Sequence, residues 1–205
     1  MKQLETIGYF SALNPGKITK NKLKSILSQY SKSQIKKAGN IKAIFFDIDG
    51  VLSDGKIIYD ETGKEIKNFS VKDGFIIRHL KKAGIIVGAI SGRESGVTQK
   101  RCAELKLDFC HQGILNKAET FEKLAKHYQL RLKEVAFIGD DINDLCVFEL
   151  AGLSVCPADT FRYIKERADL TTYAKGGEGV LREVADLVLA AQDKFEKVLE
   201  SEKRR

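Results

Sequence analysis

The fold of this chain is decided by one stretch, Ile41-Lys42-Ala43-Ile44-Phe45-Phe46-Asp47-Ile48-Asp49-Gly50-Val51. Its first six residues are mostly β-branched or aromatic, which predicts a buried strand over 41–46. Two carboxylates follow at once, and Gly50 allows the chain to turn sharply behind them. Ligands of open α/β sheets bind beyond the carboxyl ends of the strands, so Asp47 and Asp49 are candidate functional residues. Taken alone, these residues fit a plain strand with an Asp-Gly turn equally well.

Apolar runs alternate with amphipathic stretches along the rest of the chain. Strands are expected over 41–46, 85–90, 107–110, 135–138 and 153–156. Helices are expected near 74–83, 94–106, 116–128, 142–151, 160–167 and 178–200. This alternation predicts the α/β class, with a Rossmann-like, doubly wound parallel sheet covered by helices on both faces.

Three further polar motifs stand beside predicted strands or helices. Ser91 and Gly92 follow the strand 85–90, where a hydroxyl can bond a phosphoryl oxygen. Lys117 opens a predicted helix and supplies a cation. An acidic cluster after the strand 135–138 holds Asp140, Asp141 and Asp144.

These motifs, in this order, resemble those of the haloacid dehalogenase-like phosphatases. In that superfamily the first Asp of the leading motif is a nucleophile and the second a general acid/base, which implies these roles for Asp47 and Asp49. The resemblance also implies that phosphate is bound by Ser91, Gly92 and Lys117. A carboxylate cluster of this kind suits Mg²⁺. Its expected ligands are Asp47, the backbone carbonyl of Asp49, and Asp140.

The roles of Asp141 and Asp144 are left open by the sequence. Either residue could orient the metal or Lys117 from behind. Equally, both stand at the start of a predicted helix, where the helix dipole favours acidic residues whatever their function.

The spacing of the motifs leaves no room for a cap domain over the site. Only 44 residues separate Asp47 from Ser91, and only 26 separate Ser91 from Lys117. Two short alternating runs around a Gly-containing turn predict a small β-hairpin flap within 55–71. A lone hairpin is marginal in water, so we expect it to pack against the hairpins of neighbouring subunits.

A capless chain with Asp-Gly-Val-Leu-Ser-Asp-Gly at 49–55 and Val-Lys-Asp-Gly at 71–74 resembles the 3-deoxy-D-manno-octulosonate (KDO) 8-phosphate phosphatases. The resemblance covers roughly 38–193. It implies a Mg²⁺-dependent homotetramer of lipopolysaccharide biosynthesis that releases KDO and phosphate through an aspartyl-phosphate intermediate. The implied substrate contacts are Asp49, Ser70, Val71, Lys72, Asp73, Gly74, Arg78, Arg93, Arg101, Lys117 and Asp140.

Two alternatives to this function remain at the level of sequence. Ser70 departs from the family pattern, in which Asn precedes Val-x-Asp-Gly, so a nine-carbon, sialic-acid-type 9-phosphate is a second candidate substrate. A non-catalytic interaction protein on the same scaffold is the other alternative. The intact set of catalytic and phosphate-binding residues argues against it.

The net charge of +7 comes from the first part of the chain. Residues 1–42 hold nine Lys and one acid, a balance of +8, so the remaining residues sum to −1. This segment could bind nucleic acid or an acidic membrane. We favour a solvated helix face around Thr19–Lys37, with its apolar side packed inward at Leu23, Ile26, Leu27 and Tyr30.

We therefore expect three parts: a basic, partly helical extension over 1–37, a phosphatase domain over 38–193 and a charged C-terminal tail over 194–205. The resemblance leaves open whether this tail enters a neighbouring active site. The four cysteines are scattered, which is typical of free thiols in a reducing cytoplasm. No secretory or membrane-spanning segment is expected, so the protein should be cytoplasmic.

Overall fold

The structure, a computed structural model, describes residues 23–203. Its centre is a six-stranded sheet in the order β5-β4-β1-β6-β7-β8, with every neighbouring pair parallel. The strands are β1 (Ala43–Phe46), β4 (Ile86–Ile90), β5 (Phe109–His111), β6 (Val135–Ile138), β7 (Leu153–Cys156) and β8 (Leu170–Thr171). The chain runs outward from β1 to β5, then crosses back to β6. This is the doubly wound order, so the predicted fold class is confirmed.

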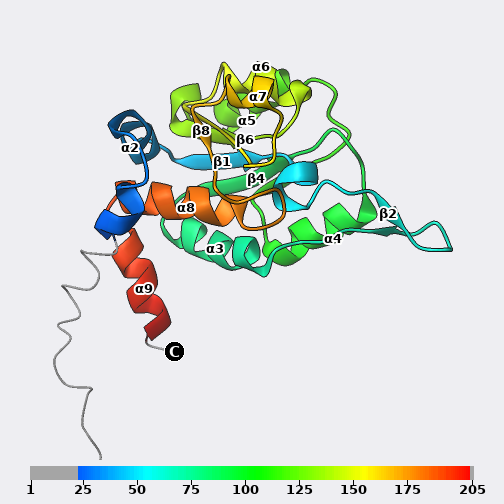
Figure 1. The fold of residues 1–205 in the computed structure, drawn as a ribbon, viewed down its shortest axis with the longest axis horizontal. Helices are drawn as coiled ribbons and strands as arrows, with labels where there is room; N and C mark the ends of the chain where they lie inside the picture. The colour runs from blue at the N-terminus through cyan, green and yellow to red at the C-terminus, as the bar shows by residue number, and fades with distance from the viewer. Residues whose placement is uncertain (1–22, 204–205) are drawn as a thin grey trace, which may run out of the picture.

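Helices cover both faces of the sheet (Figure 1). They are α2 (Lys32–Gly39), α3 (Val71–Lys82), α4 (Gly96–Leu105), α5 (Lys117–His127), α6 (Leu145–Phe148), α7 (Arg162–Lys165), α8 (Val180–Ala191) and α9 (Phe195–Lys203). Successive side chains of a strand point to opposite faces. Ile44 and Phe46 accordingly join the core under α3 and α8, and Phe45 joins the core under α5 and α6. Burial on both faces explains the continuous apolar run of β1.

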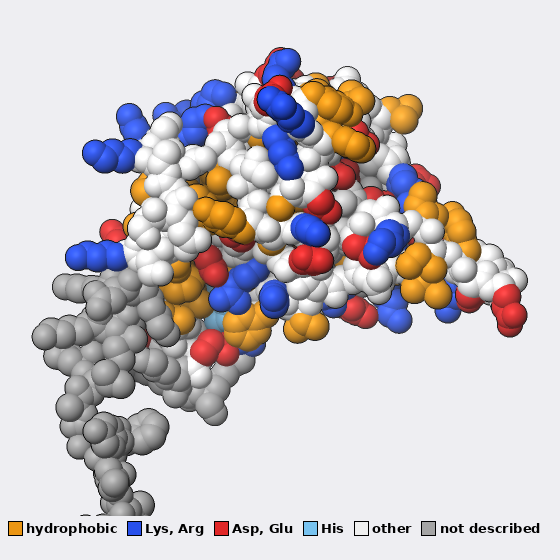
Figure 2. Space-filling model, in the orientation of Figure 1, with side chains coloured by type: hydrophobic (Ala, Val, Ile, Leu, Met, Phe, Trp, Pro, Cys, Tyr) orange, Lys and Arg blue, Asp and Glu red, His pale blue; other side chains and the backbone are white. Residues whose placement is uncertain are grey.

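The hairpin of β2 (Ile58–Tyr59) and β3 (Glu65–Ile66) projects from one end of the molecule (Figure 1). Its turn is held by Asp60, whose carboxylate accepts the backbone N–H groups of Thr62 and Lys64 at 2.9 Å each. The hairpin has the size and place predicted, and no cap domain interrupts the described chain. Figure 2 shows apolar side chains gathered at this end of the molecule. The large apolar residues exposed on the hairpin are Ile57, Ile58, Tyr59 and Ile66.

Two predicted helices are wrong in extent. The segment 178–200 is not one helix, because Asp193 adopts a left-handed φ of 55° and separates α8 from α9. The segment 142–151 forms a short 3₁₀ turn, Ile142–Asp144, followed by the four-residue α6. The two-residue strand β8 was not predicted, because so short a pairing leaves no periodic signal in the sequence.

The N-terminal helix prediction lies partly outside the described residues. Its described part contains a break, because Ser31 accepts the backbone N–H of Gln34 and begins α2 there. The inward packing is confirmed for Leu23, Ile26, Leu27 and Tyr30, which contact the main core.

The two segments predicted to flank the phosphatase domain both contain helices that pack on it. The boundary between 37 and 38 falls inside α2, which packs on α8 and pairs with the domain through Lys37 and Asp169. The supposed C-terminal tail forms α9, whose Phe195 is buried in the core. None of the helices within 23–203 has the length and apolarity that crossing a membrane requires.

Candidate active site

The predicted motifs meet at the carboxyl ends of three adjacent strands. Asp47 follows β1, Ser91 follows β4, and Asp140 lies just beyond β6. Since β1 pairs with both β4 and β6, these loops come together where the direction of the winding reverses. A cavity of about 230 Å³ opens there. It is lined by Asp47, Asp49, Gly55, Ser91, Gly92, Arg93, Asp140, Asp141 and Asn143.

Lys117 lies behind the cavity between two carboxylates. Its Nζ is 2.8 Å from Oδ2 of Asp47 and 2.6 Å from Oδ1 of Asp144, and its side chain is buried. Burial opposes the charge of Lys117, but the two carboxylates outweigh it and raise its pKa, so the ammonium persists at neutral pH. One of its three N–H groups is left for a ligand.

Asp47 is held at both oxygens. Its Oδ2 accepts Lys117, and its Oδ1 accepts the backbone N–H of Ile48 at 2.7 Å. Burial raises the pKa of Asp47 to about 6; the charge of Asp144 adds to this and that of Lys117 works against it. The carboxylate is therefore mostly ionised at pH 7, as a nucleophile must be.

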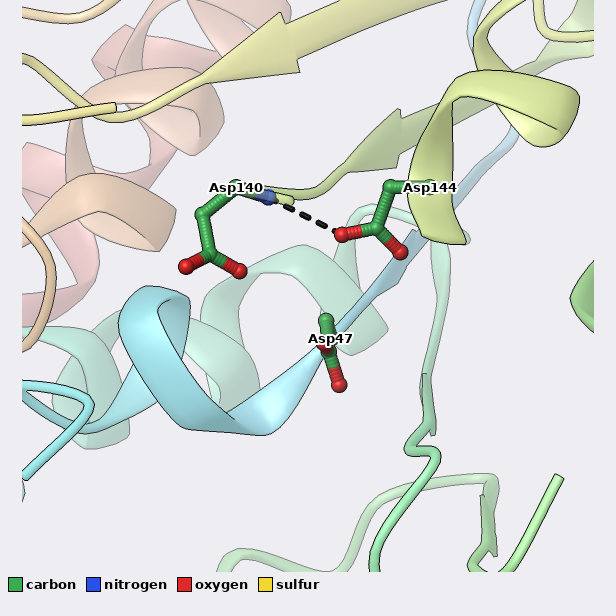
Figure 3. Close-up of side chains that lie close together, drawn as sticks. All are labelled: Asp47, Asp140 and Asp144. Atoms are coloured by element: carbon green, nitrogen blue, oxygen red, sulfur yellow. Dashed lines mark hydrogen bonds between the residues drawn. The ribbon is translucent and has the colours of Figure 1, made fainter. Parts of the chain in front are cut away.

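Three carboxylates converge beside the cavity (Figure 3). One oxygen each of Asp47, Asp140 and Asp144 lies within 4.8 Å of the others. Oδ1 of Asp140 is buried and has no hydrogen-bond partner among residues 23–203. Burial, and then repulsion by the neighbouring acids, raises the pKa of Asp140 to about 8. An unpartnered oxygen in so crowded an acidic cluster fits a cation, and hard carboxylate oxygens suit Mg²⁺.

Asp144 is occupied within the protein at both oxygens. While Oδ1 accepts Lys117, Oδ2 accepts the backbone N–H of Asp140 at 3.0 Å (Figure 3) and that of Asp141 at 3.3 Å. It thereby fixes the loop that carries Asp140 relative to Lys117. Of the two roles left open by the sequence, this geometry supports that of an orienting residue. Asp141, by contrast, lines the cavity and begins the 3₁₀ turn.

The loops after β1 and β6 touch closely at a glycine. Gly50 has a left-handed φ of 85°, and a Cβ placed on it would lie 1.9 Å from Oδ2 of Asp140. A larger residue would therefore displace the carboxylate as well as strain the backbone. The glycine of the leading motif is required by this contact.

Asp49 reaches the cavity and is bound by Arg93 and by two residues that the sequence motifs did not point to, Lys67 and Ser53. Its carboxylate accepts Lys67 at 2.6 and 2.9 Å, the Ser53 hydroxyl at 3.1 Å and Arg93 at 3.4 Å. Lys67 lies just beyond β3 of the hairpin. The structure shows why: residues alternate between buried and exposed here, which places Glu65, Lys67 and Phe69 on the face toward the domain. The sequence alone does not show which face of the hairpin turns inward.

The segment Ser70–Gly74 does not line the cavity within one chain. Ser70 begins α3 by accepting the N–H of Lys72, and Val71 is 81% exposed. Asp73 is fully buried and accepts the backbone N–H of Arg182 at 2.8 Å. Burial raises the pKa of Asp73 to about 6. Its side chain thus holds the start of α8 rather than facing a substrate.

Of the three arginines expected to bind the substrate, Arg93 alone lines the cavity. Arg78 lies toward the C-terminal end of α3, and its guanidinium pairs with the carboxylate of Glu202 in α9 at 2.7 Å. Arg101 lies over the ring of Phe69 at 5.6 Å. A Cβ on Gly74 would come within 2.8 Å of its Nη2, so that glycine makes room for the guanidinium.

Comparison with known proteins agrees with this geometry. Residues 107–184 match the family model described as haloacid dehalogenase-like hydrolase. The 3-deoxy-D-manno-octulosonate 8-phosphate phosphatase of Salmonella typhi is 42% identical over 160 residues, which are 78% of this chain and 85% of that protein. This chain belongs to the KDO 8-phosphate phosphatase family.

Solved structures of family members superpose closely. The phosphatase from Yersinia pestis matches 82% of this chain and 90% of its own at 39% identity, with a TM-score of 0.80. The family member from Moraxella catarrhalis, solved with a magnesium ion, a phosphate ion and KDO, matches 84% of this chain and 99% of its own at 35% identity. Its TM-score is 0.81. Both the acidic cluster described above and this magnesium-containing relative support Mg²⁺ as the cofactor of the family fold.

Proposed function

We propose that this protein is a Mg²⁺-dependent phosphatase that converts KDO 8-phosphate to KDO and phosphate through an aspartyl-phosphate. The observation that carries the proposal is the Asp47 carboxylate at the cavity, held by Lys117 at 2.8 Å and flanked by Asp140. Membership of the family narrows the substrate to a sugar-acid phosphate. Release of KDO would place the enzyme in lipopolysaccharide biosynthesis.

The first half of the reaction uses Asp47 as the nucleophile. The Ile48 N–H and the Lys117 ammonium fix its carboxylate, so its attack on phosphorus requires little reorganisation. As the bond between phosphorus and the sugar oxygen breaks, Asp49 gives its proton to that oxygen. In the second half Asp49 takes a proton from the water that hydrolyses the aspartyl-phosphate. Using one group as acid and then as base returns the enzyme to its starting state.

Charge on the phosphoryl group is balanced by the surrounding donors. The Ser91 hydroxyl and the Gly92 backbone line the cavity, and the free N–H of Lys117 adds a cationic donor. Asp47, Asp140 and the carbonyl of Asp49 would hold Mg²⁺, which supplies further positive charge opposite the phosphate. Asp144 fixes the position of Lys117 relative to the loop that carries Asp140.

We further propose that the working enzyme is a homotetramer built through the hairpins. The exposed Ile57 and Ile58 support this, because an apolar face of this kind favours a partner. An assembly would also explain why the outer residues Ser70, Val71 and Lys72, with Arg78 and Arg101, do not line their own chain's cavity: they would serve a neighbour's site. The four free thiols support a cytoplasmic location.

The proposed function is tested by phosphate release from KDO 8-phosphate and from a nine-carbon sialic-acid-type 9-phosphate, each with Mg²⁺. We expect the eight-carbon substrate to give the higher kcat/KM. A higher value for the nine-carbon substrate would favour the second substrate class. No release from either would favour a non-catalytic protein on this scaffold.

A further inference from the structure

Lys67 is a buried cation that the mechanism above does not use. Its side chain is 1% exposed, and its Nζ lies 2.6 and 2.9 Å from the two oxygens of Asp49. The next acid within ion-pair distance is Glu65, at 3.8 Å. A buried ammonium is costly unless it is paired, so the position of Lys67 is tied to that of Asp49.

The other partners of Asp49 hold it less firmly. Ser53 contributes a neutral hydroxyl to Oδ1, and Arg93 reaches only Oδ2, at 3.4 Å, from a side chain that is 39% exposed. Lys67 contacts both carboxylate oxygens and is shielded from water. It therefore fixes the position of the carboxylate and also its rotation about the terminal bond.

Lys67 is itself anchored through the strand that carries it. Glu65 accepts Arg93 at 3.0 Å and also the hydroxyl of Ser95, which begins α4. These contacts join β3 to the body of the domain directly beside the cavity. The hairpin consequently holds Asp49 through Lys67 and is itself held through Glu65.

We propose that Lys67 is a positioning residue for proton transfer by Asp49. When Asp49 carries its proton, Lys67 still donates to one carboxyl oxygen and holds the group so that the other oxygen delivers the proton to the ester oxygen. The bond between that ester oxygen and phosphorus breaks as Asp47 bonds to phosphorus. Lys67 acts through Asp49 and touches no reacting atom. This inference rests on the proposed function, and it gives the hairpin a part in the chemistry within a single chain.

The test compares phenyl phosphate with p-nitrophenyl phosphate. The two esters have similar shapes and no carboxylate, but phenolate is the more basic leaving group and depends more on a proton from Asp49. We expect Lys67→Met to lower kcat/KM for phenyl phosphate about 10- to 100-fold more than for p-nitrophenyl phosphate, within the range of general acid effects. Lys64→Met, on the exposed side of the same hairpin, should leave the ratio unchanged.

The ratio of the two kcat/KM values does not depend on how much of a preparation is folded. Equal losses on both esters would show that Lys67 supports the phosphate or the fold, and no loss would show that it is dispensable. A gain on phenyl phosphate would show that its charge opposes proton donation; each of these results overturns the proposal. Lys67→Gln provides a second variant if Lys67→Met does not fold.

Failure of this inference is distinct from failure of the proposed function. Suppose that the wild-type enzyme hydrolyses KDO 8-phosphate and both aryl esters, and that the Lys67 variants leave the ratio of the two kcat/KM values unchanged. That result would reject the proposed role of Lys67 but not the phosphatase activity. If the wild-type enzyme hydrolyses no phosphate ester, sugar-acid phosphates included, the proposed phosphatase function itself is rejected.

Discussion

The site has two sides: the strand-end side, formed by Asp47, Lys117 and Asp144, and the hairpin side, which faces β2 and β3. A single chain completes the first side but not the second. At the strand ends, Asp47, Lys117 and Asp144 are buried and joined by short ion pairs. At the hairpin side, Lys67 and Arg93 reach the cavity region, whereas Arg78 and Arg101 are occupied elsewhere. The groups that handle phosphate are thus assembled by the fold. Of the three arginines expected to select the sugar, Arg93 alone lines the cavity of its own chain.

The largest effect should follow from Asp47→Asn. The change keeps the shape of the side chain but removes the charge of the nucleophile, and turnover should fall at least about a thousand-fold. Phosphate release and circular dichroism would be measured on the same samples. Asp193→Asn, at an exposed position between α8 and α9, is the matched control. A folded Asp47→Asn enzyme close to wild-type activity would show that the strand-end side does not supply the nucleophile.

Removing the metal should also stop turnover, and restoring Mg²⁺ should recover it. The crowded acidic cluster is the reason, because its unpartnered Asp140 oxygen fits a cation. Phosphate release would be followed in chelator-treated enzyme before and after Mg²⁺ is added. Sustained turnover in the treated enzyme would rule out Mg²⁺ dependence.

Asp144→Asn should lower activity about 10- to 100-fold, the range typical of residues that orient metal ligands. It would weaken the hold on Lys117 and on the Asp140 loop together. A titration with Mg²⁺ would show whether metal affinity falls with it. Asp141→Asn is the control from the same turn and should cost less, since Asp141 makes no ion pair in the described chain. Equal losses would mean that the two acids act alike.

Arg93→Ala should raise KM for KDO 8-phosphate more than for p-nitrophenyl phosphate, which lacks a carboxylate. Loss of one charge-assisted hydrogen bond corresponds to about 1.5–3 kcal/mol, or roughly 10- to 100-fold.

Arg78→Ala tests whether Arg78 acts on substrate or only on the fold. If Arg78 serves a neighbour's site, its replacement should also raise KM for KDO 8-phosphate. If it only pairs with Glu202, KM should stay the same and the unfolding temperature alone should fall.

The smallest effect on chemistry should come from Ile57→Lys combined with Ile58→Lys. These residues are exposed on the hairpin, and two charges there should prevent its burial against a second copy. Light scattering should report a smaller particle, and KM for the sugar acid should rise by a few-fold. A wild-type protein that is already monomeric would contradict the tetramer and leave the strand-end side untouched.

The strand-end side was predictable from the sequence because its signals are local. β1 and Asp47 are adjacent in the chain, as are β6 and Asp140, and parallel strand ends share one edge of the sheet. The fold class followed from the same alternation of elements. Lys117 was predictable because it begins a helix and takes its expected place in the order of the motifs along the chain.

The remaining features depend on contacts between distant parts of the chain. Lys67 meets Asp49 only once the hairpin folds back on the domain. Asp73 was expected at the substrate but holds the start of α8, more than a hundred residues away. The left-handed Asp193 that separates α8 from α9 has no decisive local signal either, since residues other than glycine rarely adopt such a backbone, although aspartate does so more often than most.

The double attachment of Asp144 has a consequence for how the enzyme loses activity. One carboxylate ties the first turn of α5 to the loop after β6, and Lys117 ties both to the end of β1. Local opening of any one of these segments therefore releases the other two. The site should behave as a single cooperative unit, with the backbone amides of these three segments exchanging with solvent at a common rate. A partly denatured sample should then hold fully active and inactive molecules rather than a population of weakened ones.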